Sequence, residues 1–244
     1  MSSAPRRPGQ PALPPPVSVR LDSSVASLWQ HRVDQHVRDW YMGLRLQKFP
    51  EDLRVYEHLL WEYQPNVVIE LGGHRGGSAL WFRDRLVALA RYRPLGRPLV
   101  VSVSLDTTPA REGVALRDPG HADSIVFIDG DVRDPDLPGR VAAVLPGEAR
   151  CLVVEDTAHE YDTTMAALAG FGRFVAPGGY FVVEDGIVDV AGLRPVNAGW
   201  GGVLLAIDEW LATDDGRAFT VRRDLEMYGL TTCVRGWLHR RPSD

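Results

Sequence analysis

The sequence contains little cysteine, almost no lysine and no long apolar run. Its two cysteines, Cys151 and Cys233, lie in separate apolar stretches, so we expect buried free thiols rather than a disulfide framework. Lys48 is the only lysine, which we attribute to the base composition of the genome rather than to chemistry. No apolar run reaches the roughly 18 residues of a membrane helix, and no apolar segment follows the first arginines as it would in a secretory signal. We therefore expect a cytoplasmic protein with no membrane contact.

Length and charge limit the class of protein. The chain has 244 residues, which suits one α/β domain with a terminal extension better than two full domains. Hydrophobic residues make up 45% and charged residues 24%, so the chain can bury a core of ordinary size. A net charge of -5 argues against a nucleic-acid partner, which normally requires a basic surface.

The pattern along the chain divides it into three parts. Residues 1–17 are rich in proline and lack periodicity, which predicts a disordered or polyproline tail. Residues 18–66 are predicted to form a helical N-terminal extension, because apolar residues from Leu53 to Tyr63 recur at helical spacing. Residues 67–244 are predicted to form the catalytic domain.

Strands and helices alternate in the third part. Near-continuous runs of Val, Ile and Leu predict strands, because strands covered on both faces of a sheet lose the polar alternation. The predicted strands are 67–71, 99–105, 124–128, 151–155 and 180–184, with helices at 77–92, 107–117, 135–145 and 161–174 between them. A last helix at 203–212 and two β-rich stretches at 219–222 and 231–239 follow. Right-handed crossovers then give an α/β fold with a doubly wound, mostly parallel sheet, which binds ligands beyond the carboxyl ends of its strands.

A glycine-rich loop follows the first of these strands. Its residues are Glu70, Gly72, Gly76, Gly77 and Ser78, and a predicted helix begins there. Glycine lets the backbone approach a ligand closely, and the free N–H groups of a helix start attract an anion. His74 breaks the dinucleotide pattern GxGxxG, so the carboxylate of S-adenosylmethionine fits at least as well as a pyrophosphate. A tight turn without a ligand is the alternative.

Acidic residues also follow the second and third strands. Asp106 lies where an acid accepts hydrogen bonds from ribose hydroxyls, and Asp129, Gly130 and Asp131 lie where an adenine would bind. Both groups also fit a purely local role, because Asp106 can cap the following helix and the triplet is typical of a turn. The sequence leaves this choice open.

The strongest feature is a pair of acidic strand ends. Asp156 follows the fourth strand, and Glu184 and Asp185 follow the fifth. If the two strands are neighbours, three carboxylates converge and need a cation among them, and oxygen ligands suit Mg²⁺ or Ca²⁺ better than zinc. His159 lies three residues beyond Asp156, within reach of the same pocket as a general base. Helix caps or solvated turns would account for either pair alone, so the prediction of a metal site depends on both.

These residues resemble the cephalosporin hydroxylase family of antibiotic biosynthesis, which has a methyltransferase fold and includes rhamnosyl O-methyltransferases. The similarity extends over about residues 40–239, and it is carried by residues 43–52 (GLRLQKFPED), the glycine loop, Asp156-x-x-His159 and residues 177–186 (PGGYFVVEDG). The macrolide-sugar O-methyltransferases are similar as well, because they share the Asp-x-x-His and Glu-Asp arrangement. Three residues depart from the family pattern: His74 and Arg75 in the glycine loop, and Glu155 before Asp156.

The resemblance implies a Rossmann-like class I methyltransferase fold and an S-adenosylmethionine-dependent O-methyltransferase that uses Mg²⁺ or another divalent cation. It implies that Asp156, Glu184 and Asp185 hold the cation and that His159 is the catalytic base. It places Gly72, Ser78, Asp106 and Asp131 in the cofactor pocket. The small-molecule acceptor would be a natural product, first a rhamnosyl-type deoxysugar of an antibiotic and second a catechol-like phenol. A homo-oligomer is also expected.

Three other functions remain open. An iron oxygenase is suggested by the family's name and by His121-x-Asp123 with His159 downstream, although that triad belongs on an all-β fold. A non-catalytic module that binds S-adenosylmethionine would not need the carboxylates, and a nicotinamide-dependent dehydrogenase is disfavoured by the broken glycine pattern. Residues 187–202 follow the acidic pair and are either a substrate loop or an ordinary surface connection.

Overall fold

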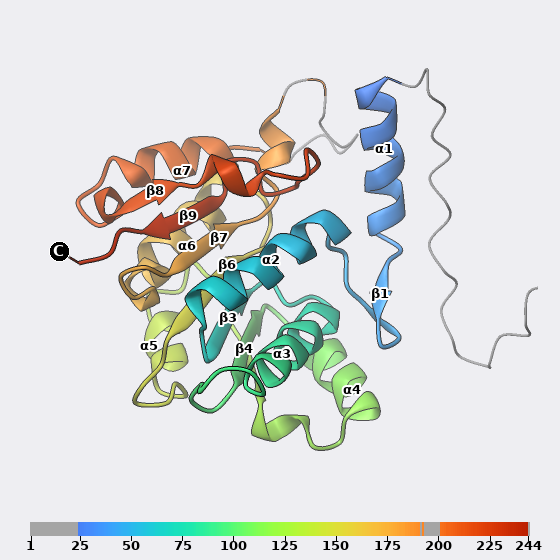
Figure 1. Cartoon of the computed structure of the whole chain (residues 1–244), viewed down its shortest axis with the longest axis vertical. Coiled ribbons are helices and arrows are strands. Elements are labelled where there is room, and N and C mark those ends of the chain that lie inside the picture. The colour runs from blue at the N-terminus through green and yellow to red at the C-terminus, as the bar shows by residue number, and fades with distance from the viewer. Residues whose placement is uncertain (1–23, 191, 193–200, 244) are drawn as a thin grey trace, which may run out of the picture.

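Figure 1 shows the computed structural model of the chain. The structure describes residues 24–190, 192 and 201–243. The tail predicted for residues 1–17, and most of the segment at 187–202, lie outside the described residues.

A seven-stranded sheet forms the middle of the molecule. Its strands are β3 (Val67–Leu71), β4 (Leu99–Ser104), β5 (Ile125–Asp129), β6 (Cys151–Glu155), β7 (Tyr180–Val183), β8 (Phe219–Val221) and β9 (Trp237–Arg240). They lie in the order β5-β4-β3-β6-β7-β9-β8, and neighbouring strands are parallel except where β9 pairs with β7 and β8. The doubly wound, mostly parallel sheet predicted from the sequence is therefore confirmed. Its order changes direction between β3 and β6, which is where such sheets bind ligands.

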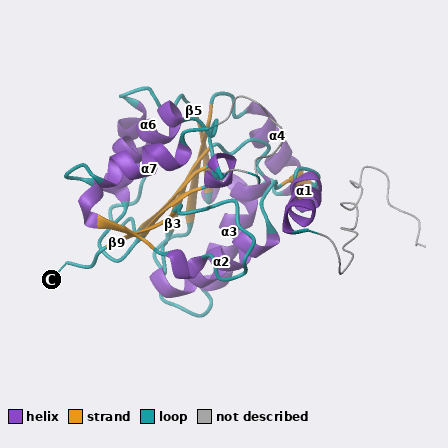
Figure 2. Cartoon of the chain, turned by 90° about the horizontal axis from the view of Figure 1, so that it is seen from above, coloured by secondary structure: helices purple, strands orange, loops and turns teal. Residues whose placement is uncertain are grey.

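Helices cover both faces of the sheet (Figures 1 and 2). α2 (Pro50–Tyr63), α3 (Gly77–Leu89) and α4 (Thr108–Arg117) pack on one face, and α5 (Leu137–Ala142), α6 (Tyr161–Phe171) and α7 (Val203–Leu211) pack on the other. The apolar side chains of β3 alternate between these layers, because Val67, Ile69 and Leu71 join one core cluster and Val68 joins the other. Both faces of the strand are thereby buried, which explains its continuous apolar run.

Short 3₁₀ turns complete the regular structure. They are η1 (His121–Asp123), η2 (Gly172–Phe174), η3 (Gly186–Asp189), η4 (Gly216–Ala218) and η5 (Arg223–Leu225).

The segment before the sheet is less helical than its periodicity predicts. α1 (Val25–His36) is followed by a hairpin of β1 (Trp40–Tyr41) and β2 (Leu44–Arg45) before α2 begins. A helix cannot continue through Met42 and Gly43, because their φ angles are 49° and 81°. α1 lies at one side of the domain, beside this hairpin (Figure 1).

The β-rich stretch predicted at 231–239 is a strand only from Trp237 onward. Thr231 and Thr232 instead direct their hydroxyls, and Thr232 its N–H, at the carboxylate of Asp52 in α2. Arg235 then turns the chain into β9 with a φ of 57°. Tertiary hydrogen bonds therefore override the local β pattern here.

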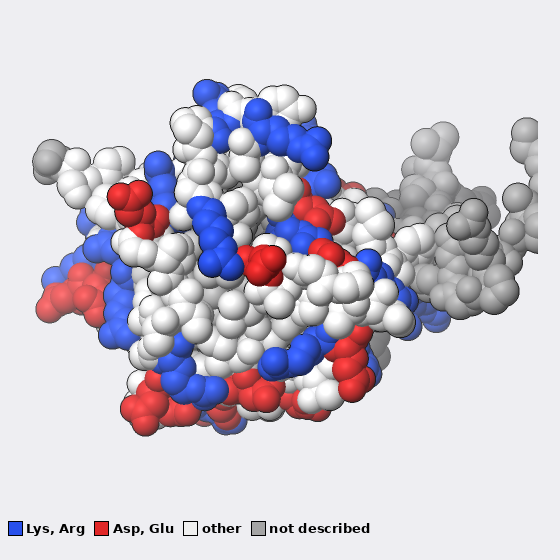
Figure 3. Space-filling view, turned by 90° about the horizontal axis from the view of Figure 1, so that it is seen from below, with Lys and Arg blue, Asp and Glu red and all other residues white. Residues whose placement is uncertain are grey.

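Surface charge, helix character and the cysteines can each be compared with the sequence analysis. Acidic and basic side chains are interspersed on the face drawn in Figure 3. Within the part of the chain that the structure describes, no helix has the length and apolar character required to cross a membrane. Cys151 and Cys233 are buried free thiols, as predicted, and burial raises the pKa of Cys151 to about 12.

Candidate active site

The acidic residues singled out in the sequence lie at one edge of the sheet. β6 pairs in parallel with β3 on one side and β7 on the other, so the carboxyl ends of the three strands lie side by side. The N–H of Asp156 donates to the carbonyl of Leu71 at 2.8 Å, and the N–H of Glu184 donates to the carbonyl of Glu155 at 2.9 Å. The expectation that the two acidic strand ends are neighbours is confirmed by this pairing.

A cavity of about 700 Å³ opens at this edge. Residues after the strand ends line it, among them Gly72, His74, Ser104, Asp106, Gly130, Asp131, Asp156, His159 and Asp185. α1 contributes His36, with Val37 just beyond it. A volume of several hundred Å³ is typical of small-molecule sites.

Gly72 joins the glycine loop to the residue after β6. Its φ is 107°, and an added Cβ would lie 1.8 Å from the carbonyl oxygen of Asp156. Its N–H donates to the carbonyl of Val103 at 2.8 Å. Only glycine permits this approach, so the loop and the Asp156 peptide are in direct contact.

The other residues of the loop that were assigned to cofactor binding are not part of the cavity wall. Glu70 is fully buried and accepts a hydrogen bond from the hydroxyl of Ser102 at 2.8 Å. Gly77 begins α3, and a Cβ there would lie 2.0 Å from the carbonyl oxygen of Arg45, so the hairpin packs against the start of this helix. Gly76 and Ser78 flank it and, like Glu70 and Gly77, do not line the cavity. Their assignment to cofactor binding stays a prediction.

Asp106 combines the two roles that the sequence left open. It lines the cavity, and its Oδ1 accepts a hydrogen bond from the N–H of Thr108 at 2.9 Å at the start of α4. Asp129 does not line the cavity. It accepts hydrogen bonds from the N–H and the hydroxyl of Thr107, at 2.8 and 2.7 Å, and so supports the turn that carries Asp106.

Gly130 and Asp131 lie in the cavity wall. Hydrogen bonds from the side chain and the N–H of Arg133 lower the pKa of Asp131 to about 2, so its carboxylate is ionised at any physiological pH. This end of the cavity is thus suited to groups that donate hydrogen bonds.

The structure brings Asp156, His159 and Asp185 together at the other end. Each offers a ligand atom, and these atoms lie within 4.8 Å of one another. Nδ1 of His159 lies 3.3 Å from Oδ2 of Asp185. His159 and Asp185 have positive φ angles, 58° and 56°, and backbone conformations of this kind concentrate at functional sites.

The carboxylates alter the protonation of this cluster. Burial lowers the pKa of His159, but the charges of Asp185 and Asp156 outweigh it, and the pKa is raised from its usual value. Burial raises the pKa of Asp156, although Lys48 opposes the shift.

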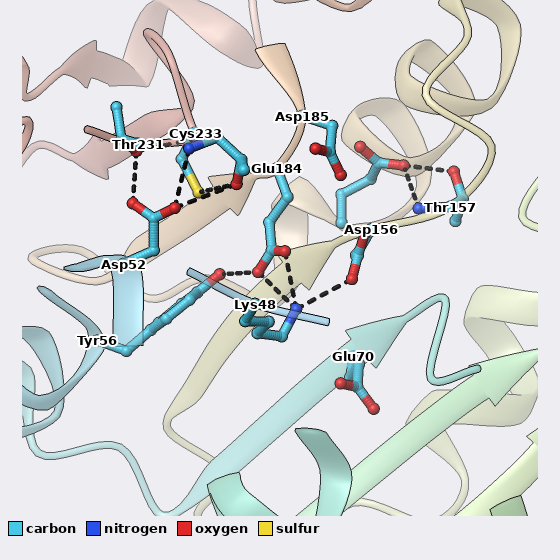
Figure 4. A network of polar contacts seen from close by, with 12 residues as sticks. Lys48, Asp52, Tyr56, Glu70, Asp156, Thr157, Glu184, Asp185, Thr231 and Cys233 are labelled. Carbon is cyan, nitrogen blue, oxygen red and sulfur yellow. Dashed lines mark hydrogen bonds and ion pairs between the residues drawn. The ribbon is translucent and has the colours of Figure 1, made fainter. Parts of the chain in front are cut away.

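Glu184 points away from the cavity, to Lys48 and Tyr56 (Figure 4). The Lys48 ammonium donates to Oε1 and Oε2 of Glu184 at 2.7 and 2.8 Å, and the Tyr56 hydroxyl donates to Oε1 at 2.5 Å. Glu184 is not among the residues of the cavity wall. Its predicted role as a metal ligand stays a prediction, while Lys48 and Tyr56 are site residues that the sequence analysis missed. The signal for Lys48 was its status as the only lysine.

Two further carboxyl groups are buried close by. Asp52 accepts hydrogen bonds from Thr231 and Thr232, and burial raises its pKa to about 7. Burial also raises the pKa of Glu155 to about 7, although the hydroxyl and N–H of Thr157 donate to its Oε1. Each group is therefore close to half ionised at neutral pH.

His36 is a second histidine in the cavity wall, and the sequence analysis also missed it. Its Nδ1 lies 2.7 Å from the carbonyl oxygen of Val33, so this nitrogen carries the proton and Nε2 is the acceptor. Burial lowers the pKa of His36, although the charge of Asp185 opposes the shift. A neutral imidazole therefore lines the α1 side of the cavity.

The iron site considered from the sequence is contradicted by the fold. His121 and Asp123 form η1 just before β5 begins, whereas His159 follows the end of β6. β5, β4, β3 and β6 are parallel, so the start of β5 and the end of β6 lie at opposite edges of the sheet. His121 and Asp123 therefore cannot share a metal ion with His159.

Comparisons with known proteins agree with this geometry. A family model described as Rhamnosyl O-methyltransferase/CmcI matches residues 33–241. A rhamnosyl O-methyltransferase of Mycobacterium tuberculosis is 28% identical over 207 residues, which cover 82% of this chain and 77% of that protein. A rhamnosyl O-methyltransferase of Mycobacterium leprae is 28% identical over 148 residues, which cover 59% of each chain.

Solved structures share the fold. A CmcI structure with SAH has a TM-score of 0.59 at 19% identity, covering 93% of this chain and 97% of that chain. CalS11, a TDP-rhamnose 3'-O-methyltransferase, has a TM-score of 0.52 at 21% identity, covering 80% of this chain and 77% of that chain. Since the family model spans most of the sequence, the chain belongs to the rhamnosyl O-methyltransferase/CmcI family and is an O-methyltransferase with the class I fold.

Proposed function

We propose that this protein transfers the methyl group of S-adenosylmethionine to a sugar hydroxyl of a small-molecule acceptor, assisted by Mg²⁺ or another divalent cation. The observation that carries the proposal is the cluster of Asp156, His159 and Asp185, which lies in the same cavity as the glycine loop. The rhamnosyl O-methyltransferase relatives support a sugar acceptor, and a rhamnosyl-type deoxysugar of an antibiotic is our first candidate.

The cavity offers groups suited to S-adenosylmethionine. Gly72 lies in its wall, where a residue without a side chain lets a ligand approach the backbone closely. Asp106 and Asp131 are acceptors in the wall, suited to the ribose hydroxyls and the adenine amino group. This arrangement directs the sulfonium end toward Asp156 and His159.

The residues at the strand ends also fit a hard divalent cation. Carboxylate oxygens are the ligands that Mg²⁺ prefers, and two carboxylates and an imidazole lie close together there. Asp156 and Asp185 would hold the cation, whereas both oxygens of Glu184, the third ligand predicted from the sequence, are engaged by Lys48. A cation bound there would lower the pKa of an acceptor hydroxyl and fix its orientation.

His159 is suited to remove the hydroxyl proton. Its Nδ1 lies 3.3 Å from Oδ2 of Asp185, which favours a proton on that nitrogen and makes Nε2 the acceptor of the ring. The hydroxyl oxygen then attacks the sulfonium methyl group as the carbon–sulfur bond breaks, giving a methyl ether and S-adenosylhomocysteine. His159 lies in a half-buried part of the wall, where holding both reactants in line accelerates transfer.

The acceptor has its place on the α1 side of the cavity. His36, Val37 and Gln47 line this side, next to Asp185. Nε2 of His36 can accept a hydrogen bond from a second hydroxyl of the sugar. This bond would orient the sugar without removing the proton of that hydroxyl. Two neighbouring hydroxyls, one at the carboxylate cluster and one at His36, match a sugar ring.

Titration calorimetry on the metal-stripped full-length chain tests the proposal. S-adenosylmethionine is titrated with and without Mg²⁺ into the wild type and Asp156→Ala. Asp214→Asn serves as the control, because that side chain is 97% exposed. We expect cofactor binding by all three proteins and a Mg²⁺ signal that only Asp156→Ala loses.

Other results would contradict it. Cofactor binding without any response to Mg²⁺ would keep the fold but exclude the carboxylate cluster as a metal site. Absence of cofactor binding would favour the dehydrogenase or a binding module.

The acceptor is tested by turnover. With a rhamnosylated acceptor, His159→Gln should lower kcat by at least about 100-fold, the contribution typical of a general base, while it still binds the cofactor. Near-normal turnover by His159→Gln would remove the base assignment. Turnover of a catechol but of no glycoside would exclude the sugar.

A further inference from the structure

Lys48 stands out because it is the only lysine of the chain and is 2% exposed. It lies between β2 and α2, and Figure 4 shows its ammonium among the carboxylates of the candidate metal site. Burying an ammonium is costly unless it is paired and hydrogen-bonded. The groups that pair with the ammonium therefore indicate what Lys48 does.

Three carboxylate oxygens surround the ammonium. They are Oδ2 of Asp156 at 3.0 Å and both oxygens of Glu184, at 2.7 and 2.8 Å. An ammonium has three protons, so each can have its own acceptor. The ammonium is therefore fully paired with carboxylates inside the protein.

This geometry suits a lysine and not an arginine. The ammonium is a compact point charge that reaches oxygens on two different strand ends, whereas a guanidinium is a flat fork made for one carboxylate. Arginine supplies every other positive side chain among the 27 Lys and Arg residues. The choice of lysine here therefore has a chemical reason.

The ammonium also lies on the protein side of Asp156. Asp156, His159 and Asp185 line the cavity, and Lys48 is not among the residues of its wall. The contact with Lys48 engages Oδ2 of Asp156 from within the core. A cation that enters from the cavity would reach Asp156 through the cavity wall, of which Lys48 is not a part.

We propose that Lys48 is a positioning residue that fixes the Asp156 carboxylate for the divalent cation, with Glu184 and Tyr56 as its anchor. This inference rests on the proposed function, because it requires that Asp156 binds the cation. Groups that orient a metal ligand from behind raise metal affinity about 10–100-fold. A lysine that merely occupied the metal position would have the opposite effect, since its removal would tighten metal binding.

The test is calorimetry of Mg²⁺ alone with the metal-stripped full-length chain. Lys48→Met has a side chain of similar length without charge, and we expect Mg²⁺ to bind about 10–100-fold more weakly than to the wild type. Arg54→Met is the matched control, because Arg54 is an exposed cation on α2 that pairs only with Glu57 among the ion pairs of the described residues. Its Mg²⁺ affinity should equal that of the wild type.

A double-mutant cycle separates this role from a general loss of structure. If Lys48 acts through Asp156, adding Lys48→Met to Asp156→Asn causes no further loss of Mg²⁺ affinity. Additive losses would overturn the inference, as would unchanged or tighter binding by Lys48→Met. If Lys48→Met does not fold, Lys48→Arg replaces it, and wild-type Mg²⁺ affinity of that variant would overturn the inference.

The two proposals fail in different ways. A wild type that binds no Mg²⁺ would contradict the metal-assisted function and this inference with it. A wild type that binds Mg²⁺ through Asp156, with Lys48→Met equal to it, would contradict the role of Lys48 alone.

Discussion

Gly72→Ala tests the contact that holds the two halves of the site together. The new Cβ would lie 1.8 Å from the carbonyl oxygen and 2.4 Å from the carbonyl carbon of Asp156, at a φ of 107°. Backbone strain at such an angle costs about 1–2 kcal/mol. Overpacking adds about 1–3 kcal/mol, because the β3 end and the Asp156 peptide must separate. We therefore expect a loss of roughly 3 kcal/mol in the free energy of unfolding, or about 6–12 °C in Tm for a chain of this length.

Gly178→Ala isolates the strain from the clash. Gly178 has a φ of 79°, and an added Cβ would have no heavy atom within 4 Å. Strain alone should cost about 1 kcal/mol there, or about 2–4 °C. Both variants are compared by thermal unfolding and by titration with S-adenosylmethionine, for which only Gly72→Ala should bind weakly. Equal loss of Tm in the two variants, or unimpaired cofactor binding by Gly72→Ala, would refute the reasoning.

Three further predictions concern stability. Asp52 has a pKa near 7 when folded and near 4 when unfolded, so the folded state binds more protons between these values, and the free energy of unfolding falls as pH rises from 4 to 7. Urea unfolding at pH 5 and 8 should show this fall, by about 3 kcal/mol, in the wild type and a smaller one in Asp52→Asn; equal falls would contradict it. Asp189 accepts hydrogen bonds from the N–H groups of Gly202 and Leu204, both at 2.8 Å, at the start of α7. Asp189→Ala should therefore lower the free energy of unfolding by about 1–2 kcal/mol and speed amide exchange at Leu204. Unchanged exchange would exclude this cap. Phe171 is fully buried, so Phe171→Ala should lower the urea unfolding free energy by about 3–5 kcal/mol, and a loss under 1 kcal/mol would show that the site collapses.

The sequence predicted the sheet well because its signals are local. The five buried strands are continuous apolar runs, and β3 and β6 begin and end at the residues expected. The hairpin at residues 40–45 and the coil at Thr231 were not foreseen. Each depends on partners elsewhere, since the hairpin packs on Gly77 of α3 and Thr231 binds Asp52 of α2.

The candidate site, like the fold, could be predicted from the sequence only in part. The glycine loop and the acidic strand ends could be predicted, because parallel strands end at one edge of a sheet and ligands bind beyond that edge. The sequence left open whether Asp106 caps a helix or lines a pocket, and in the structure it does both. The sequence could not show that Asp131 lies in the cavity wall, whereas Asp129 supports the turn at Thr107.

By itself, then, the sequence determined the class of fold and the edge of the sheet at which the candidate site lies, because periodicity and strand-end patterns act over a few residues. Only the tertiary structure decided which side chains meet there. Lys48 reaches Asp156 and Glu184 across 108 and 136 residues of chain, and His36 enters the cavity from α1. Contacts between residues so far apart in the sequence form only when helices and loops pack over the sheet. Burial then makes an unpaired charge costly, so buried charged groups lie next to groups of opposite charge.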